Sequence, residues 1–354
     1  MTDPDAPRKG RGAASNRDSR YHLLRHESFD DGWPPGEEPE PLRTRLERDT
    51  SRSIINRVRS PDLPFDRTIN PYRGCEHGCI YCYARPSHAR LGYSPGLDFE
   101  SRIVCKPDAA ALLREELARP GYVCRPIALG GNTDIYQPVE RRLGITRSLL
   151  EVLREHCHPL TLVTKSALVL RDVDLLSEMA ERALCQVMIS VTTLDHGLAR
   201  RMEPRAAAPA RRLEVIRRLA AAGIPVGVLV APVIPVLTDP EMESVLARAR
   251  EAGASFAGYT LLRLPGEVAE LFPEWLSHHR PGQAAHVMNA IRDTRGGRDS
   301  DSAFGRRMRG TGPLADAIAQ RFRLAHARSR FVSAPPLDTE AFRVPGSGSQ
   351  LSLL

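Results

Sequence analysis

The stretch Asn70-Pro-Tyr-Arg-Gly-Cys75-Glu-His-Gly-Cys79-Ile-Tyr-Cys82-Tyr-Ala-Arg-Pro86 decides how the rest of the chain is interpreted. It holds three cysteines within eight residues, and a glycine precedes each of the first two. Glycine lets the backbone turn where other residues are strained, so a compact loop can direct all three sulfurs to one place. The stretch therefore predicts a metal centre held by Cys75, Cys79 and Cys82.

The spacing Cys-x3-Cys-x2-Cys separates the kinds of metal centre. Thiolates suit both zinc and iron-sulfur clusters. A structural zinc site closes with four ligands in two pairs, and no second pair follows here at the usual distance. Three ligands on a cubane cluster leave one iron free for a small molecule. The alternative that stays open is a structural zinc knuckle with His77 as the fourth ligand.

With the aromatic Tyr81 directly before Cys82, the motif resembles the signature of the radical S-adenosylmethionine (SAM) enzymes. The resemblance implies a [4Fe-4S] cluster at the three cysteines, whose open iron binds SAM. Reductive cleavage of SAM then yields a 5'-deoxyadenosyl radical that abstracts hydrogen from a substrate. The resemblance also implies a flavodoxin-like or ferredoxin-like electron donor, and it places Tyr81 near the adenine of SAM.

Composition places the chain among globular proteins. Its 354 residues, 42% of them hydrophobic, suffice for one large domain with tails. No apolar run reaches the roughly 18 residues of a membrane span, and no export leader is recognisable. Seven cysteines at irregular spacing do not resemble a disulfide framework. We therefore expect a cytoplasmic protein without a membrane partner.

Beyond the cysteine loop, short apolar stretches alternate with helical patterns, as in parallel sheets buried on both faces. After a first strand that leads into the loop, strands are predicted at 126–129, 160–164, 186–191, 225–230 and 256–262. Helices are predicted at 108–118, 145–156, 172–182, 210–222 and 240–252. Six alternating strands predict an α/β fold, an open partial (β/α)6 barrel of the TIM type, which the radical SAM resemblance also implies. Residues 99–104 remain either an additional strand or a hairpin.

Composition also divides the chain into four segments. Residues 1–60, rich in charge, Pro and Gly, are predicted to be a mostly disordered, mobile linker. Residues 61–279 form the barrel, 280–332 a basic cap, and 333–354 a tail. Within the cap, Pro313 begins a helical pattern that predicts a basic helical extension.

In parallel barrels the chemistry gathers at the carboxyl ends of the strands. After the second strand, Gly130 and Gly131 resemble the Gly-Gly-Glu loop with which the family holds the amine of SAM, although Asn132 stands in the place of Glu. Paired glycines let the backbone approach a ligand closely, and Asn132 adds a polar contact. A plain turn is the alternative.

The next two strands end in further candidates for binding SAM. Lys165 follows the third strand, where its ammonium can meet a carboxylate or an anionic substrate. Ser190 and Thr192 end the fourth strand on one face, which suits the ribose or carboxylate of SAM. A surface lysine and strand-end hydroxyls without a ligand are the alternatives. Tyr259 and Arg263, after the sixth strand, are weaker candidates at the barrel mouth.

The formal net charge of +7 is concentrated near the carboxyl end. The segment 280–330, from Arg280 to Arg330, holds eleven arginines and four aspartates. Such a basic face can track the phosphates of a nucleic acid. The alternative is a solvated surface, because the chain uses 47 arginines against three lysines. A non-catalytic module that binds a metal and a nucleic acid is the competing function.

Further motifs resemble the spore photoproduct lyase-like branch, the DNA repair photolyase homologues, over about residues 60–330. They are Tyr81-Cys-Tyr-Ala-Arg85, Thr133-Asp134, Tyr136-Gln137-Pro138 and Met202-Glu-Pro-Arg205. In that branch, thymine-dimer repair returns hydrogen from a cysteine near the second-strand loop. The loop Gly130-Gly-Asn-Thr-Asp134 contains no cysteine, so the substrate stays open.

The four remaining cysteines are interpreted as small buried hydrophobes. They are Cys105, Cys124, Cys157 and Cys185. Cys105 or Cys124 is the alternative hydrogen donor to a substrate radical.

Overall fold

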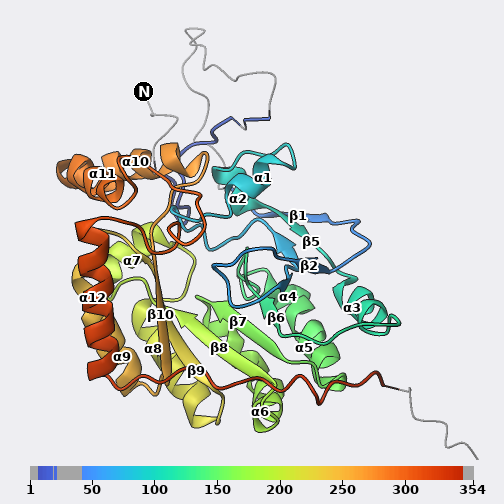
Figure 1. Ribbon diagram of the computed structural model, residues 1–354. Helices are drawn as coiled ribbons and strands as arrows, with labels where there is room; N and C mark the ends of the chain where they lie inside the picture. Colours follow the sequence, from blue (N-terminus) through green and yellow to red (C-terminus); the bar gives the residue numbers. More distant parts are fainter. Residues whose placement is uncertain (1–6, 19, 22–41, 346–354) are drawn as a thin grey trace, which may run out of the picture.

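The structure is a computed structural model that describes residues 7–18, 20–21 and 42–345, and in it helices cover a mostly parallel sheet (Figure 1). The main sheet has seven strands in the order β10-β9-β8-β7-β6-β3-β2. Six of them run parallel, and the edge strand β2 pairs antiparallel with β3. The α/β class and the six parallel strands agree with the prediction, and the sheet is consistent with a partial barrel.

Five strands of the main sheet, β6 to β10, lie close to the predicted ranges; β3 is the strand that leads into the cysteine loop, and β2 was not predicted and falls inside the predicted linker. The strands of this sheet are β2 (Ile55–Arg57), β3 (Arg67–Ile69), β6 (Ile127–Leu129), β7 (Leu160–Thr164), β8 (Cys185–Ser190), β9 (Val226–Val233) and β10 (Phe256–Leu261). The helices are α1 (Pro86–Ala89), α2 (Leu97–Ser101), α3 (Ala109–Leu117), α4 (Glu140–Leu143), α5 (Ile145–Glu155), α6 (Val173–Glu181), α7 (His196–Met202), α8 (Pro209–Ala221), α9 (Met242–Glu251), α10 (Val268–His279), α11 (Ala284–Asp293) and α12 (Pro313–Arg328).

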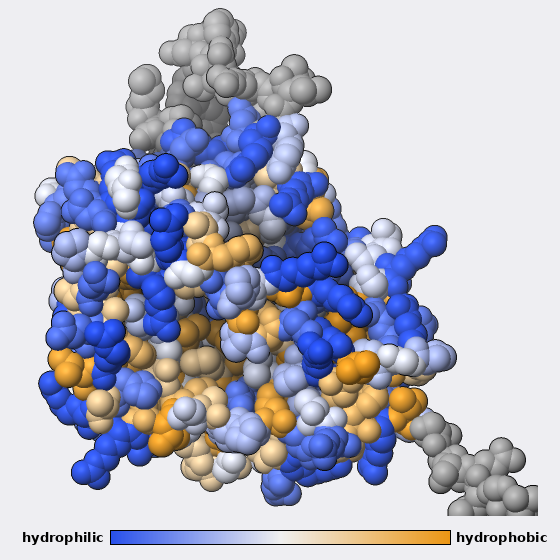
Figure 2. Space-filling model, viewed as in Figure 1, coloured by the Kyte–Doolittle hydropathy of each residue, from blue (hydrophilic) through white to orange (hydrophobic). Residues whose placement is uncertain are grey.

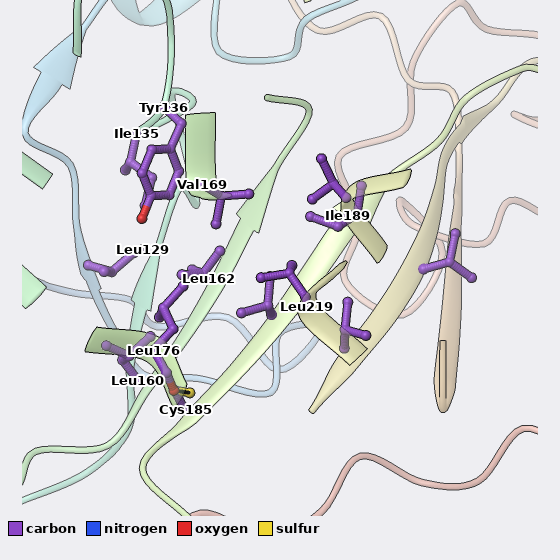
Figure 3. Packing of buried hydrophobic residues seen from close by; sticks show 14 of the residues in the cluster. Leu129, Ile135, Tyr136, Leu160, Leu162, Val169, Leu176, Cys185, Ile189 and Leu219 are labelled. Atoms are coloured by element: carbon purple, nitrogen blue, oxygen red, sulfur yellow. Dashed lines mark hydrogen bonds between the residues drawn. The ribbon is translucent and has the colours of Figure 1, made fainter. Parts of the chain in front are cut away.

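The core forms between the sheet and its helices because the apolar residues follow the period of each element. In α5, Ile145, Leu149 and Leu153 recur every four residues and are all buried. In β7, every second residue is buried, from Leu160 onward. Figure 3 shows the side chains of β6, β7 and α6 packed together in this core. The packing fixes the strand ends at which the candidate site lies.

A second, small sheet was not predicted. It has the order β1-β5-β4, with β1 (Arg45–Arg48), β4 (Tyr72–Arg73) and β5 (Arg102–Cys105). Residues 99–104, predicted as a strand or a hairpin, divide into the end of α2 and the start of β5. The sequence of β1, Arg-Leu-Glu-Arg, has too little apolar character to signal a strand, and it falls inside the predicted linker.

The segment after residue 280 lies partly over the sheet end and partly in the outer helical layer. The Leu261 N–H donates to the Met308 carbonyl at 2.9 Å, which places the loop before α12 at the carboxyl end of β10. Helix α12 packs beside α9 (Figure 1), where Arg321 forms ion pairs with Asp239 and Glu243. The predicted helix from Pro313 is present, but it extends the outer helical layer rather than covering the mouth.

The described part of the predicted tail, residues 333–345, is held along the amino ends of the strands. The amide of Asp338 donates to Ala183 at 2.9 Å and that of Arg343 to His156 at 3.0 Å. The ring of Phe342 packs 5.4 Å from that of Tyr122. The segment has no regular structure, but backbone hydrogen bonds and an aromatic contact attach it to the rest of the protein. It therefore differs from the loose tail that was predicted.

The described part of the predicted linker is also partly packed, since Ala13, Ala14 and Ser15 are buried. The rest of that prediction, at 1–6, 19 and 22–41, and the end of the tail at 346–354 lie outside the described residues. Among the helices that the structure describes, none combines the length and the apolar character needed to cross a membrane.

Candidate functional site

The cysteine loop begins after β4 and depends on its two glycines. Gly74 and Gly78 have φ angles of +79° and +66°, in the left-handed region that favours glycine. A Cβ on Gly74 would lie 2.9 Å from the Phe99 carbonyl oxygen, and one on Gly78 would lie 2.6 Å from the Glu100 carboxylate. Conformation and space therefore both require glycine at these positions, as the sequence indicated.

A completely buried arginine organises the interior of the loop. The Arg85 guanidinium donates to the carbonyls of Gly78 and Cys79 at 3.2 and 2.9 Å. It also donates to Pro95 and Gly96 at 3.0 and 2.9 Å, and to the equally buried Glu100 carboxylate at 2.5 Å. A buried charge is tolerated when it is paired and its donors are satisfied. Arg85 thus ties the turn between Cys75 and Cys79 to the start of α2.

The three cysteine thiols are free, and two of them are buried, Cys75 at 7% and Cys79 at 9% exposure. Burial, the Asp134 carboxylate and the other two thiols raise the pKa of Cys75 well above its ordinary value. Burial, with Glu203 adding to it, raises the pKa of Cys79 to about 12. Because the thiolate is the ligand, metal binding here must release protons. Three thiols from one loop, two of them buried, fit a group that binds soft sulfur ligands.

Within the residues that the structure describes, no three His, Cys, Asp or Glu side chains are grouped so as to hold a single metal ion. His77, the fourth ligand in the zinc alternative, has its Nδ1 3.3 Å from the Asp134 carboxylate.

The second-strand loop packs against both the cysteine loop and β7. Gly130 has a φ of +83°, and a Cβ there would lie 2.4 Å from the Val163 carbonyl oxygen, so only glycine fits. The carbonyl of Gly131 accepts a hydrogen bond from the hydroxyl of Tyr83, the residue after Cys82. The amide of Asn132 donates to the Asn70 side chain at 3.1 Å. The three predicted residues therefore lie beside the cysteine loop.

Asp134 joins this loop to the end of β7. Its carboxylate accepts from the Thr164 hydroxyl and the Lys165 amide, both at 2.7 Å, and faces His77. Burial alone would raise the pKa of Asp134, but His77 and the two donors outweigh it and lower the pKa to about 2. The carboxylate therefore stays ionised and fixes the backbone from which the Lys165 side chain extends.

The predicted residues of the third and fourth strands meet at one carbonyl. The Lys165 ammonium donates to the Ser190 hydroxyl at 2.7 Å and to the Ala231 carbonyl at 3.3 Å. The Ser190 hydroxyl donates to the same carbonyl at 3.0 Å, and the Thr192 hydroxyl lies 3.1 Å from it. Because β7, β8 and β9 are parallel neighbours, their carboxyl ends bring these side chains together. They form a polar group that can hold a carboxylate or a hydroxyl.

Tyr81 reaches the same polar group through a buried ion pair that sequence analysis missed. Its hydroxyl lies 3.3 Å from the Thr192 hydroxyl and donates to Glu203, which also accepts from Thr192 at 2.7 Å. Glu203 pairs with Arg212 of α8, and neither side chain is more than 2% exposed. Lys165 lies 5.9 Å from the centre of the Tyr81 ring. The four candidates for binding SAM in the cysteine loop and at the strand ends are therefore linked by direct contacts; they are Tyr81, Lys165, Ser190 and Thr192.

Charge balance keeps this ion pair ionised. Burial would raise the pKa of Glu203, but Arg212 and Lys165 outweigh it and lower the pKa to about 2. Burial and the Glu203 carboxylate raise the pKa of Tyr81 well above its ordinary value, so its hydroxyl remains a donor. The sequence contains a signal for Glu203, because it lies in the charged stretch 200–205, which follows no apolar pattern. No sequence signal indicates that Arg212 is buried, because an arginine in an amphipathic helix normally faces solvent.

Many arginines of the basic segment are engaged within the protein. Five of its eleven lie within 4.0 Å of a carboxylate, namely Arg280, Arg292, Arg306, Arg307 and Arg321. Arg295 is buried and donates to carbonyls, among them Leu261 at 3.1 Å and Leu262 at 2.6 Å. Figure 2 shows hydrophilic residues spread over the whole visible face rather than gathered in one patch. Much of the excess charge is therefore structural.

Two arginines near the cysteine loop stack on tyrosines instead of pairing with acids. The Arg263 guanidinium lies 4.6 Å from the centre of the Tyr83 ring, and that of Arg309 lies 4.2 Å from the centre of the Tyr259 ring. Burial lowers the pKa of Arg263, and the nearby Arg307 lowers it further. Neither guanidinium forms an ion pair with a carboxylate of the described chain. Of the two weaker candidates, Arg263 thus pairs with the exposed Tyr83 beside the third cysteine, whereas Tyr259 is buried against Phe322.

Three of the four other cysteines are buried, as predicted, whereas Cys124 is only half-buried. Cys157 and Cys185 are at most 1% exposed, and Cys105 is buried at the end of β5 in the small sheet. Cys124 precedes β6, at the amino end of the main sheet. Neither Cys105 nor Cys124 lies at the carboxyl end of a main-sheet strand, where the candidate site is.

The comparisons with known proteins agree with this geometry. A family model described as "Radical SAM superfamily" matches residues 69–249. An uncharacterized protein of Mycobacterium tuberculosis is 38% identical over 233 residues, which span 65% of this chain and 68% of the relative. An uncharacterized protein of Methanocaldococcus jannaschii is 28% identical over 191 residues, which span 54% of this chain and 68% of the relative.

Two solved structures share the fold. A spore photoproduct lyase complexed with a dinucleoside spore photoproduct has a TM-score of 0.57 and 16% identity, over 80% of this chain and 79% of that one. A mutant of that lyase with bound AdoMet and the dinucleoside has a TM-score of 0.56 and 14% identity, over 81% of this chain and 82% of the other.

The Glu203–Arg212 pair yields a prediction about stability and pH. Arg212→Met leaves the Glu203 carboxylate buried without its cation, and such a loss costs about 3–5 kcal/mol. In the wild type the pKa of Glu203 is lowered from 4.5 to about 2, so its contribution is complete above pH 4.5 and disappears as the pH falls to about 2. In Arg212→Met the pKa of Glu203 should rise, because burial is no longer outweighed by this cation, so the stability lost between pH 4.5 and 2 should become smaller or reverse in sign.

Chemical denaturation at several pH values measures both effects. Arg211→Met is the matched control, because Arg211 is the exposed neighbour on the same helix. Equal unfolding free energies for the two variants at pH 7 would contradict the importance of the buried pair.

Proposed function

Because the chain belongs to the radical SAM superfamily, whose enzymes use a [4Fe-4S] cluster and SAM, we propose that Cys75, Cys79 and Cys82 hold the cluster of this enzyme. When bound, the cluster supplies the electron that cleaves SAM to a 5'-deoxyadenosyl radical, which removes hydrogen from the substrate. The observation that carries the proposal is that Tyr81 connects the cysteine loop to the polar group of Lys165, Ser190 and Thr192. A non-catalytic zinc module is not favoured, because a structural zinc site would not need a polar group beside the cysteine loop.

The residues around the loop would orient SAM. In this proposal the Lys165 ammonium meets the carboxylate of SAM, and the Ser190 and Thr192 hydroxyls hold its carboxylate or ribose. The backbone of Gly130–Asn132 approaches the amine, since glycine removes the side chains that would keep a ligand away. Tyr81 would pack near the adenine, its hydroxyl held by Glu203.

The same structure would prepare these groups before SAM binds. Asp134 fixes the Lys165 backbone, and the ionised Glu203 keeps the Tyr81 hydroxyl in place. Preorganised polar groups of this kind lose less freedom on binding than mobile ones do. The burial of Cys75 and Cys79 limits the access of water to the proposed cluster.

For the substrate we propose a nucleic acid. The structures that share the fold are of an enzyme bound to a dinucleoside, and in this proposal Arg263, the exposed Tyr83 and the exposed Arg309 form a cationic rim. Aromatic and arginine groups together suit bases and phosphates. The reaction on that substrate is left open, because the loop 130–134 contains no cysteine to return a hydrogen atom.

The enzyme would further need a reductant, for which a flavodoxin-like or ferredoxin-like protein is proposed. The seven cysteines are all free thiols, which suits a reducing compartment such as the cytoplasm.

The first test concerns the cluster. Protein reconstituted without oxygen is expected to contain about four iron and four sulfide per chain, to change its EPR spectrum when SAM is added, and to release 5'-deoxyadenosine with a reductant. Cys79→Ala should abolish all three, whereas Cys124→Ala, at the opposite end of the sheet, should retain them. Zinc in place of iron, or an EPR spectrum indifferent to SAM, would contradict the proposal.

The second test concerns SAM. Lys165→Gln removes the ammonium but not the cysteines, so we expect unchanged iron content and a SAM affinity lowered about 10- to 100-fold, the equivalent of one charge-assisted hydrogen bond. Anaerobic calorimetry measures the affinity. Lys9→Gln, at an exposed lysine, is the control. A wild-type affinity in Lys165→Gln would remove Lys165 from the site.

The third test concerns the nucleic acid. Arg263→Gln combined with Arg309→Gln should weaken the binding of a single-stranded oligonucleotide and reduce the slope of log affinity against log salt by about 1.4, that is about 0.7 for each lost phosphate contact. Arg328→Gln, exposed at the end of α12, should leave both unchanged. Fluorescence anisotropy over a range of salt concentrations gives the slopes. Equal slopes in all three proteins would argue against a nucleic-acid substrate at this rim.

A further inference from the structure

The amino-terminal strap, defined here as Arg11–Ser15, packs directly on the cysteine loop. A Cβ on Gly12 would lie 1.8 Å from the Gly78 carbonyl oxygen and 3.0 Å from its carbon, so the two backbones are in contact. That carbonyl belongs to the peptide bond that joins Gly78 to Cys79. Ala13 is 1% exposed and joins the hydrophobic cluster that contains Cys79 and Tyr81. The strap therefore covers one side of the loop.

The Glu100 carboxylate joins the strap to the loop. Its two oxygens accept from the amides of Gly12 at 2.9 Å and Ala13 at 2.8 Å. One of them also accepts from Arg85, the arginine that holds the interior of the loop. The Arg11 guanidinium adds a bond of 2.7 Å to the Glu100 carbonyl. Bonds to an ionised, fully buried carboxylate are strong, so the strap and the loop share one anchor.

Beyond Ser15 the chain is attached to α10 by polar contacts near the surface. The Ser15 hydroxyl donates to Glu274 at 2.8 Å, Arg17 lies 3.5 Å from the same carboxylate, and Arg20 pairs with Glu267 at 2.7 Å. Arg17 and Arg20 are 42% and 49% exposed, and ion pairs so exposed to solvent stabilise little. The buried bonds of Gly12 and Ala13 to Glu100 thus hold the strap next to the proposed cluster, and further bonds, such as that of the Leu97 amide to the Ser15 carbonyl at 3.3 Å, hold its end against α2.

We propose that the strap is a cover of the metal centre, which limits the access of water and small solutes to the cluster on the side of Cys79. The proposal rests on the cluster site proposed above. Solvent exposure and hydrogen bonding around the sulfurs control the properties of iron-sulfur clusters. Without the strap, the Gly78–Cys79 peptide and the Arg85–Glu100 pair would face solvent on that side.

Gly12→Val tests the cover, because a valine cannot fit against Gly78. In the cluster-loaded full chain we expect the strap to detach, so that trypsin cleaves after Arg11 or Arg17 faster than in the wild type. A chelator such as EDTA should then extract iron about 10-fold faster under anaerobic conditions, while the iron and sulfide content before extraction stays the same. Gly282→Val is the matched control, since nothing lies within 4 Å of a Cβ at Gly282.

Several outcomes would overturn the proposal. Faster cleavage of the strap with iron extraction at the wild-type rate would show that the strap covers nothing. Unchanged cleavage in Gly12→Val would show that the strap does not pack on Gly78.

A second measurement needs no variant. The amides of Gly12 and Ala13 should exchange slowly with deuterium in the wild type, because both donate to the buried Glu100, and rapid exchange would refute the cover. Deuterium exchange at these amides can be measured without a bound metal. If the wild type takes up no cluster, the proposed function fails, but the exchange rates still show whether the strap is packed.

Discussion

The site depends on the buried ion pair between Arg85 and Glu100. Arg85 holds the carbonyls of Gly78 and Cys79 from inside the loop, and Glu100 holds both Arg85 and the amides of the strap. Removing either charge would leave the other buried without a partner, which is among the most costly changes in a protein interior. The pair therefore keeps the backbone around the cysteines in one conformation before any metal arrives. The cluster of this radical SAM enzyme is expected to bind a loop that is already shaped.

Around this loop, the structure builds a second polar group from parallel strands. Lys165, Ser190 and Thr192 follow two neighbouring strands, and they meet at the Ala231 carbonyl at the end of a third. Strands of one direction bring their carboxyl ends to one edge, so residues far apart in sequence become neighbours. Tyr81 and the Glu203–Arg212 pair join this edge to the cysteine loop. The proposed metal ligands and the candidate cofactor contacts thus form one connected network.

Sequence reasoning succeeded where local patterns carry the information. The positive φ at Gly74 and Gly78 follows from the turns that three close cysteines need, and the shared face of Ser190 and Thr192 follows from the period of a strand. The apolar runs located five of the six parallel strands, whose side chains pack against the helices. The seventh strand, β2, and the strand β1 of the small sheet escaped, since these short strands have no fully buried residue and lack such runs.

What sequence reasoning missed depends on contacts between distant residues. Gly12 and Glu100 are 88 positions apart, and nothing near Gly12 indicates a buried partner. Arg307, which the charge count treats as unpaired, forms an ion pair with Asp62, which is 245 positions away. Arg212 faces inward because the buried Glu203 and the carbonyls of Ala207 and Ser190 accept its hydrogen bonds. A charge count along the chain therefore overestimated the free basic surface, and a segment rich in Gly and charge proved partly packed.

The central claim is that three cysteines hold a four-iron cluster and leave one iron open to SAM. Mössbauer spectroscopy of protein reconstituted with 57Fe tests it most directly, because the spectrum separates irons by their ligands. The account predicts that the parameters of one iron in four change when SAM is added and that the other three stay the same. Four irons that are indifferent to SAM, or protein that takes up no iron cluster at all, would contradict it.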